Sequence, residues 1–334
     1  MNNDKFKKLD VARSYRVKYG AEMPTLKLAR IMYNDCPTMF TSVETCRTIL
    51  RKIEGKNGVS NLKYAKDTEF FMEEERPRNP YNLPQSFEKV REPFVLPPEC
   101  DNILYGSDHH FPYQNNAAIE AWMQFGVDNN VNCIFMNGDL MDFHQISRHE
   151  KDPRKRSVKQ EFEATDQFLS SLRKTFPEAH IYWLKGNHDI RWEKFLLMKA
   201  HEIWDDSYFY LEQRLNLNQK NITMIDDKLM VMAGKLMITH GHVLTAAGKN
   251  PAEKALNKAG QSVVMGHLHR YDYFERTTAH KETKQQAWVI PCLCELQPDY
   301  NVLSNSQHGF AHIRVKDNGD FSLKPYIIEN GIIQ

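Results

Sequence analysis

The sequence lacks a long hydrophobic run, a large net charge and a cysteine framework, and each absence excludes a class of protein. No apolar segment in the 334 residues approaches the roughly 20 residues that a membrane-spanning helix needs. The formal net charge is +1, so no global field draws the whole protein to DNA or to a membrane surface. The six cysteines are scattered and show neither a disulfide framework nor Cys-x-x-Cys zinc spacing.

The N-terminal stretch MNNDKFKKLD is polar and has no apolar core of a signal peptide. Together with the scattered cysteines, this favours a reducing, cytoplasmic setting. Hydrophobic residues make up 41% of the chain and charged residues 26%, which predicts ordinary globular domains. The length allows one large domain or two smaller ones.

Residues 1–60 form a basic region with 12 Lys and Arg against 6 Asp and Glu, a local excess of +6. Apolar residues three or four apart predict helices over 4–20, 24–35 and 41–55, the last opening with Thr41 and Glu44 at capping-box spacing. Arg47 and Arg51 share a face of the third helix, with Lys52 beside it. Two interpretations stay open: a helix-turn-helix-like module that binds DNA or RNA, or a small helical cap with a solvated basic face.

Residues 61–98 are predicted to be a linker. Six prolines between positions 77 and 98 keep this stretch extended and out of helices and central strands. We expect Phe87, Phe94 and Leu96 to lie against the next domain, which spans 99–334.

From residue 101 onward, short apolar runs alternate with helical segments such as 115–129 and 159–176, which is typical of an α/β domain. Five apolar runs each lead into Gly, Ser or Thr and then into Asp, Asn or His: 102–108, 132–139, 180–189, 235–242 and 262–269. Ligands of α/β sheets gather outside the carboxyl ends of the strands. A closing hairpin around Asn318-Gly319 is also predicted.

The polar side chains that follow these strands are carboxylates, an amide and imidazoles, without a thiolate. They are Asp108, His110, Asp139, Asn187, His188, His240, His242, His267 and His269. Such ligands suit a hard or borderline divalent ion. Their number exceeds what one ion binds, which indicates two ions that share a carboxylate.

The five motifs, in order and type, resemble the calcineurin-like metallophosphoesterase superfamily over roughly residues 101–315. They are Asp108-x-His110, Gly138-Asp139-x-x-Asp142, Gly186-Asn187-His188-Asp189, His240-Gly241-His242 and Gly266-His267-x-His269. The resemblance implies a four-layer α/β/β/α sandwich with two mixed β-sheets. The stretches GDLMDFHQISRHEKDPRKR and GNHDIRWE also look like a branch of the superfamily common in phages, which would make the chain bacterial or phage-encoded.

The resemblance also implies roles for individual residues. One ion would be held by Asp108, His110, Asp139 and His269. The other would be held by Asp139, Asn187, His240 and His267, with Asp139 bridging the two. His188 would be the general acid and Asp189 would orient it. Mn²⁺ is the first choice of metal, with Fe, Zn, Ni and Mg as alternatives.

The expected reaction is attack on phosphorus by a hydroxide that bridges the two ions, with His188 protonating the leaving group. Arg191 and Arg270 are candidates for binding a phosphate oxygen, and a salt bridge is the alternative for each. The basic segment 147–159 is interpreted either as a lid over an anionic substrate or as a solvated loop. We expect His242 and Asp142 to support the site and His109 to point away from it.

The predicted function is a dinuclear metal-dependent phosphodiesterase acting on nucleic acid, in the manner of a nuclease. The alternative is a phosphomonoesterase or a phosphodiesterase of small nucleotides or cyclic nucleotides. A third hypothesis, from a different class, is a non-catalytic nucleic-acid-binding protein with this fold. The sequence leaves the oligomeric state open.

Overall fold

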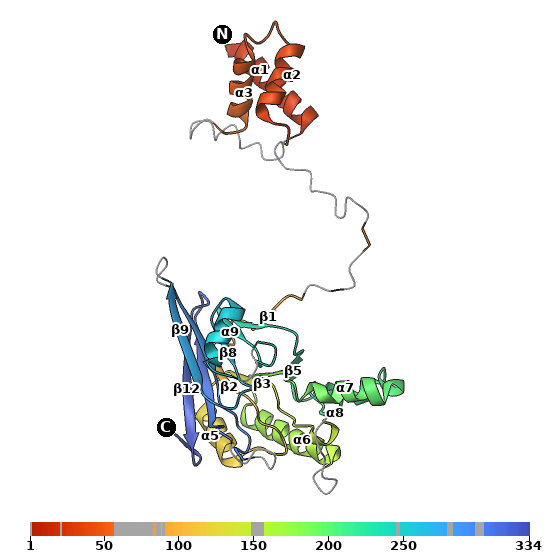
Figure 1. Cartoon of the computed structure of the whole chain (residues 1–334), viewed down its shortest axis with the longest axis vertical. Coiled ribbons are helices and arrows are strands. Elements are labelled where there is room, and N and C mark those ends of the chain that lie inside the picture. The colour runs from red at the N-terminus through yellow and green to blue at the C-terminus, as the bar shows by residue number, and fades with distance from the viewer. Residues whose placement is uncertain are drawn as a thin grey trace. The chain divides into compact units, whose positions relative to one another are not determined.

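The computed structural model describes residues 2–20, 22–56, 83–84, 88, 91–147, 157–244, 248–278, 283–297 and 304–334. The chain divides into two compact units, residues 1–89 and 90–334 (Figure 1). In the described parts of the chain, no helix is long and apolar enough to cross a membrane.

The N-terminal unit consists of three helices: α1 (Asn2–Tyr19), α2 (Thr25–Asp35) and α3 (Val43–Ile53). They form because apolar residues repeat at helical spacing, and Leu28, Met32 and Leu50 are fully buried in their shared core. The three predicted helices are confirmed. The N-cap of α3 is Ser42 and not Thr41, because the Ser42 hydroxyl accepts the Thr45 backbone N–H at 3.2 Å.

A buried ion pair between Arg16 of α1 and Glu54, the C-cap of α3, connects the ends of the helices. The side chains of these two residues are 3% and 5% exposed. Arg16 also donates to the Met23 carbonyl at 2.6 Å, and Thr25 donates to Glu54 at 3.0 Å. Hydrogen bonds satisfy the remaining polar atoms, which a buried charge pair requires.

We predict that Glu54→Ala in the full chain loosens the N-terminal unit. Loss of one partner leaves a buried charge and costs about 3–5 kcal/mol. Hydrogen exchange of peptides from 7–53 should therefore accelerate strongly, while peptides from 102–137 keep their protection. The control is Glu44→Ala, which removes an exposed α3 carboxylate that pairs with Arg47 at 3.3 Å and should change exchange little. Equal exchange in both variants would contradict the role of the buried pair.

The second unit contains two mixed β-sheets. The seven-stranded sheet has the spatial order β13 (Ile332–Ile333), β12 (Phe321–Glu329), β11 (His308–Val315), β2 (Asn102–Gly106), β3 (Cys133–Asn137), β4 (His180–Leu184) and β5 (Ile222–Ile225). Strands β2 to β5 are parallel, while β11 is antiparallel to both β2 and β12. The β11–β12 pair is the predicted hairpin around Asn318-Gly319.

The six-stranded sheet has the spatial order β1 (Phe94–Val95), β6 (Val231–Ala233), β7 (Leu236–Ile238), β8 (Val263–Met265), β10 (Thr283–Val289) and β9 (Asp272–Thr278). Strands β7, β8 and β10 run parallel. The remaining described helices include α5 (Asn116–Asp128), α6 (Val158–Thr175), α7 (Ile190–Lys199), α8 (Leu211–Arg214) and α9 (Pro251–Ala259), with short 3-10 turns at His144–Ile146, His201–Ile203 and Ser207–Phe209.

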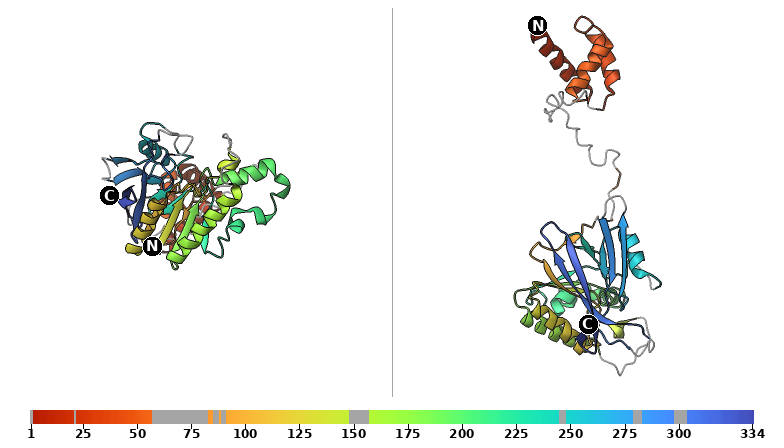
Figure 2. Two further views of the ribbon diagram at one scale, coloured as in Figure 1. Left: turned by 90° about the horizontal axis from the view of Figure 1, so that it is seen from below. Right: turned by 90° about the vertical axis from the view of Figure 1, so that its left-hand side faces the viewer.

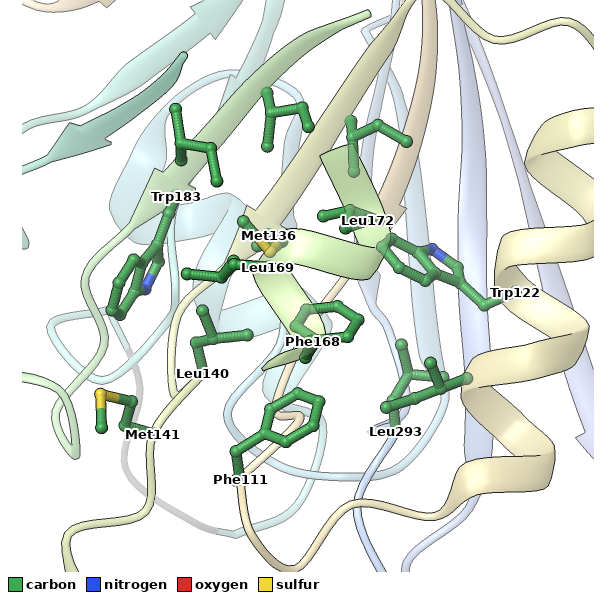
Figure 3. Close-up of a cluster of buried hydrophobic side chains, with 14 of the residues drawn as sticks. Phe111, Trp122, Met136, Leu140, Met141, Phe168, Leu169, Leu172, Trp183 and Leu293 are labelled. Carbon is green, nitrogen blue, oxygen red and sulfur yellow. The ribbon is translucent and has the colours of Figure 1, made fainter. Parts of the chain in front are cut away.

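Three hydrophobic clusters hold four layers together, which confirms the predicted α/β/β/α sandwich. Helices α5 and α6 lie on one side of the seven-stranded sheet (Figures 1 and 2). Figure 3 shows part of this layer, where Trp122 of α5 and Leu169 of α6 pack near Met136 and Trp183 of the sheet. A second cluster fills the space between the sheets, and a third joins α9 to the six-stranded sheet.

The range 61–98, assigned to a linker from the sequence, lies largely outside the described residues. Its last part belongs structurally to the second unit, because β1 pairs in parallel with β6. Phe94 packs against the cluster between the sheets and Leu96 is buried in it, while Phe87 lies outside the described residues. The division into 1–60, 61–98 and 99–334 stays a prediction.

Parallel strands place their carboxyl ends on one edge of a sheet. Strands β2, β3 and β4 end there in one sheet, and β7 and β8 in the other. All five predicted motifs follow these ends, so the two sheets bring them together. Five motif residues have a left-handed backbone, with φ between 50° and 68°: Asp108, His110, Asp139, His267 and His269. Such backbone strain concentrates at functional sites.

Candidate metal centre

Two imidazole rings are fixed by hydrogen bonds on the side away from the centre. His110 donates from Nδ1 to Asp142 Oδ1 at 2.8 Å, and His240 donates from Nδ1 to the Asn137 carbonyl at 2.8 Å. Each ring therefore presents its Nε2 lone pair to the centre. A hydrogen bond on the opposite ring nitrogen is the usual arrangement for a histidine that binds metal.

Acceptor atoms converge on these Nε2 atoms. His240 Nε2 lies 3.1 Å from Asp139 Oδ2 and 3.1 Å from Asn187 Oδ1. His110 Nε2 lies 3.3 Å from His269 Nε2, which is 3.2 Å from Asp108 Oδ1. Asp108 Oδ1 is buried and has no hydrogen-bond partner among the described residues. Lone pairs that face one another in a buried space fit a cation between them.

Asp139 belongs to two groups of potential metal ligands, one with Asp108 and His110 and the other with His240 and His267. Its Oδ2 lies 3.1 Å from His240 Nε2 and 3.9 Å from His110 Nε2, while its Oδ1 accepts the His188 backbone N–H at 2.7 Å. The structure thus brings all seven sequence-predicted ligands together, with Asp139 where a bridging carboxylate would lie.

Two glycines allow the loops to approach this closely. A Cβ on Gly186 would collide with the Asp139 carboxylate, and a Cβ on Gly138 would collide with the His240 ring. Gly138 also has a φ of 81°, which L side chains rarely adopt. Each glycine is therefore needed for the close approach of a carboxylate or an imidazole.

These observations agree with a family match. The model of the calcineurin-like phosphoesterase family matches residues 102–303. The chain belongs to the calcineurin-like phosphoesterases. It is therefore a metal-dependent phosphoester hydrolase, and its buried His and Asp groups correspond to the dimetal site typical of that family.

Relatives of this calcineurin-like phosphoesterase include two mycobacteriophage proteins. The chain is 26% identical over 197 residues to the Gene 54 protein of Mycobacterium phage D29. The matched region covers 56% of this chain and 76% of the relative. It is 24% identical, with the same coverage, to the Gene 54 protein of Mycobacterium phage L5. The expected likeness to phage members of the family is confirmed as a distant similarity.

Similar solved structures include the nuclease MPE of Pseudomonas putida, with 14% identity, a TM-score of 0.32 and coverage of 69% of this chain and 85% of that one. The phosphoesterase Yfce of E. coli has 12% identity, a TM-score of 0.32 and coverage of 67% and 98%. Vps29 of Chaetomium thermophilum has 13% identity, a TM-score of 0.35 and coverage of 71% and 94%. These scores add nothing on function.

His188, the predicted general acid of this calcineurin-like phosphoesterase, is held at both ring nitrogens. Its Nδ1 donates toward the Asp142 carbonyl at 2.9 Å and Asp142 Oδ1 at 3.1 Å. Its Nε2 accepts from Arg191 Nη2 at 2.9 Å, and Arg191 Nη1 donates to the Asp142 carbonyl at 2.8 Å. Burial lowers the pKa of His188 from its usual 6.5, and the charge on Asp139 opposes this.

The carboxylate that contacts His188 is therefore Asp142 and not Asp189, which corrects the expected orienting residue. The Asp189 carboxylate accepts the backbone N–H groups of Gly186 at 2.8 Å and Met141 at 2.9 Å, and the Trp183 indole N–H at 3.2 Å. These bonds hold the Gly186–Asp189 turn to the sheet. Asp189 thus shapes the loop that carries Asn187 and His188.

The other predicted residues lie around the centre. Arg270 follows His269 and donates to the Gly248 carbonyl at 2.8 Å. His242 Nε2 lies 3.6 Å from Asp227 Oδ2. The ring centroid of His242 is 5.5 Å from that of His240, so His242 borders the centre. His109 points away, as expected, into an aromatic pocket with Phe111, Trp122 and Phe168. Residues 148–156 of the basic segment 147–159 lie outside the described residues.

Sequence reasoning missed Cys294 and Glu161. Cys294 Sγ lies 3.8 Å from His269 Nδ1, behind a candidate ligand. Glu161 of α6 is fully buried and accepts the Phe143 backbone N–H at 2.8 Å, so it fixes the residue after Asp142. The only sequence signal for Glu161 is that an acidic residue stands on the apolar face of a predicted helix. The sequence holds no comparable signal for Cys294.

Glu161 generates a pH prediction. Burial, with the nearby negative charge of Asp142, raises the pKa of Glu161 from 4.5 to about 8. The folded state then binds more protons than the unfolded state between pH 4.5 and 8, so stability falls as pH rises through this window. Glu161→Gln should flatten this fall in urea unfolding at pH 5, 6.5 and 8. The exposed neighbour substitution Glu163→Gln is the control, and identical pH slopes for all three proteins would refute the raised pKa.

Proposed function

We propose that this calcineurin-like phosphoesterase is a dinuclear metal-dependent phosphodiesterase whose substrate is a nucleic acid. The grouping of Asp139 with Asp108 and His110 on one side, and with His240 and His267 on the other, carries the dinuclear part of the proposal. Asn187 adds a neutral oxygen, which keeps the anionic charge of the centre low for an approaching phosphate.

The candidate ligands divide into two sets around the shared Asp139. Asp108, His110 and His269 form one set, and Asn187, His240 and His267 form the other. When bound there, two divalent ions would supply an activated water and charge neutralisation for phosphoryl displacement. Mn²⁺ remains the first choice, because the described ligands are oxygens and imidazoles.

His188 is proposed to protonate the leaving oxygen from Nε2. Asp142 holds the opposite nitrogen and so fixes the ring orientation. Arg191 now donates to Nε2, and a guanidinium binds phosphate oxygens well. A bound phosphate that attracts the guanidinium would free Nε2 to take up a proton from water, and His188 would then give that proton to the leaving oxygen. Arg191 is therefore proposed to bind substrate.

The proposal predicts different losses for two substitutions. With Mn²⁺, the wild-type chain should hydrolyse bis-p-nitrophenyl phosphate. His188→Gln should keep its metal and lose roughly 10²–10⁴-fold in kcat, because proton transfer contributes about that much. Asp139→Asn should lose metal and activity together. Activity is measured by nitrophenol release, and metal content by elemental analysis of the same samples.

The Arg276→Ala variant, altered on the exposed strand β9, is the control and should retain both metal and activity. Hydrolysis of a monoester without any diester hydrolysis would refute the phosphodiesterase proposal and favour the phosphomonoesterase alternative. Full metal loading with no hydrolysis of the diester would likewise contradict the phosphodiesterase proposal.

The N-terminal unit supports the choice of nucleic acid. Cys46, Leu50 and Ile53 turn one face of α3 into the core of the unit, so Arg47 and Arg51 lie on other faces. The basic excess of residues 1–60 falls on this small unit. Lysine and arginine that neutralise backbone phosphates supply most of the affinity of non-specific DNA binding. We therefore propose α3 as the main contact with DNA or RNA.

Arg47→Ala combined with Arg51→Ala should weaken DNA binding and make it less salt-dependent. Each lost phosphate contact should reduce the slope of log K against log salt by about 0.9. Fluorescence anisotropy with a labelled duplex from 50 to 200 mM salt measures this. The control removes the same charge elsewhere, with Arg314→Ala and Lys316→Ala. Equal slopes in both double variants would refute a specific role of α3.

A further inference from the structure

A hollow opens beside the candidate metal centre, with a volume of about 640 Å³. Three separate segments line it: the turn before α9, the turn between β8 and β9, and Asn305. This volume lies within the roughly 300–1,000 Å³ of pockets that bind small molecules. None of the roles proposed above for the metal ligands or for His188 uses this space.

Two residues that line the hollow are neighbours, along the chain, of candidate metal ligands. Leu268, which lines it, stands between the candidate ligands His267 and His269, and Arg270 is the next residue. The Gln307 N–H donates to the His269 carbonyl at 2.7 Å, and Gln307 Oε1 accepts the Tyr271 N–H at 2.8 Å. These bonds fix the wall of the hollow to a ligand of the centre. The wall of the hollow is therefore one residue away from two candidate ligands along the chain.

The charges of the lining favour an anion. Lys249 and Arg270 are positive, and Asp272 is the opposing carboxylate. Asp272 Oδ2 already accepts the Ala252 N–H at the start of α9, at 3.0 Å. Arg270 uses one N–H for the Gly248 carbonyl, and a guanidinium has five donors. The lining therefore offers a fixed cation whose other donors suit a phosphate.

The remaining lining groups suit a nucleoside. The side chain of Tyr271 is 37% exposed and presents an aromatic ring on which a base can stack. Asn250 and Asn305 add amides that both donate and accept hydrogen bonds to base or sugar edges. Neither an acyl chain nor a protein segment would use this combination of cation, ring and amides as fully.

We infer that the hollow lined by Lys249, Arg270 and Tyr271 is a nucleotide subsite, which holds the nucleotide next to the scissile phosphate. This inference rests on the proposed phosphodiesterase function and assigns the residues that would hold the nucleotide beside the scissile phosphate. Arg270 binds the neighbouring phosphate, and Tyr271 stacks on the base.

Binding to the full, metal-loaded chain tests the subsite. The probes are thymidine 3′,5′-bisphosphate, which has one phosphate for the centre and one for Arg270, and inorganic phosphate, which reports on the centre alone. Both are measured by isothermal titration calorimetry. Arg270→Ala should lower the affinity for the nucleotide relative to phosphate by roughly tenfold to a hundredfold, because it removes charge-assisted hydrogen bonds. Arg276→Ala is the matched control, since Arg276 lies on β9 outside the hollow and donates to Asn257 and Gln285. It should leave the ratio within twofold.

An unchanged affinity ratio in Arg270→Ala, or equal changes in the Arg270 and Arg276 variants, would overturn the subsite. Kinetics separate this outcome from a failure of the proposed function. In Arg270→Ala, KM for a 5′-phosphorylated thymidine dinucleotide, which carries a phosphate beside the scissile one, should rise at least tenfold more than KM for bis-p-nitrophenyl phosphate. If the wild-type chain hydrolyses no diester, the phosphodiesterase proposal fails, while the binding ratio still decides whether Arg270 forms a nucleotide subsite.

Discussion

The arrangement of the second unit, residues 90–334, depends on ligand atoms of carboxylates and imidazoles that face one another in a buried space. Asp108, Asp139 and the Nε2 atoms of His110 and His240 lie within about one ligand shell of each other. Burial lowers the pKa of His240, but the carboxylates of Asp139 and Asp108 outweigh this and raise it to about 9, so without an ion a shared proton holds ring and carboxylate together. They stay in place because groups behind them are already bonded: Asn137 holds His240, and Asp142 holds both His110 and His188. The ligands are therefore positioned before any ion binds.

Packing of the hydrophobic layers offsets the backbone strain at the candidate metal centre. Left-handed backbone at non-glycine residues such as Asp108, Asp139 and His269 costs of order 1–3 kcal/mol each. Strands β2 and β3, which lead to Asp108 and Asp139, are buried between α5 and α6 on one side and the second sheet on the other. Strand β8, which leads to His269, is buried between the seven-stranded sheet and α9. Tight packing fixes where each strand ends, so the loops have little freedom to relax. The strained loops with the candidate ligands thus depend on the packing of the four layers.

Features that depend on local pattern could be predicted from the sequence, and those that depend on tertiary contacts could not. Apolar runs that end in polar motifs predicted the strands, and the parallel arrangement of those strands places the motif residues at one edge. The sequence did not show which carboxylate contacts His188, because Asp189 is its neighbour along the chain but turns toward backbone N–H groups, whereas Asp142 arrives from another strand. Strand β1 was missed for a similar reason: two residues near prolines become a strand only beside β6. Glu161 looks like any acidic helix residue until its burial is seen.

The distribution of positive charge around the centre bears on the choice between diester and monoester. A monoester carries a second negative charge on its phosphate, whereas a diester carries one charge and a second organic group. Arg191 donates to His188 and to the Asp142 carbonyl, which leaves three of its five N–H groups for one oxyanion. Arg270 lies on the wall of a hollow large enough for an organic group. Arg191 lies at His188, the proposed general acid, and Arg270 lies on the wall of the hollow. Two cations in these places suit a substrate that continues past its scissile phosphate, as a polynucleotide does.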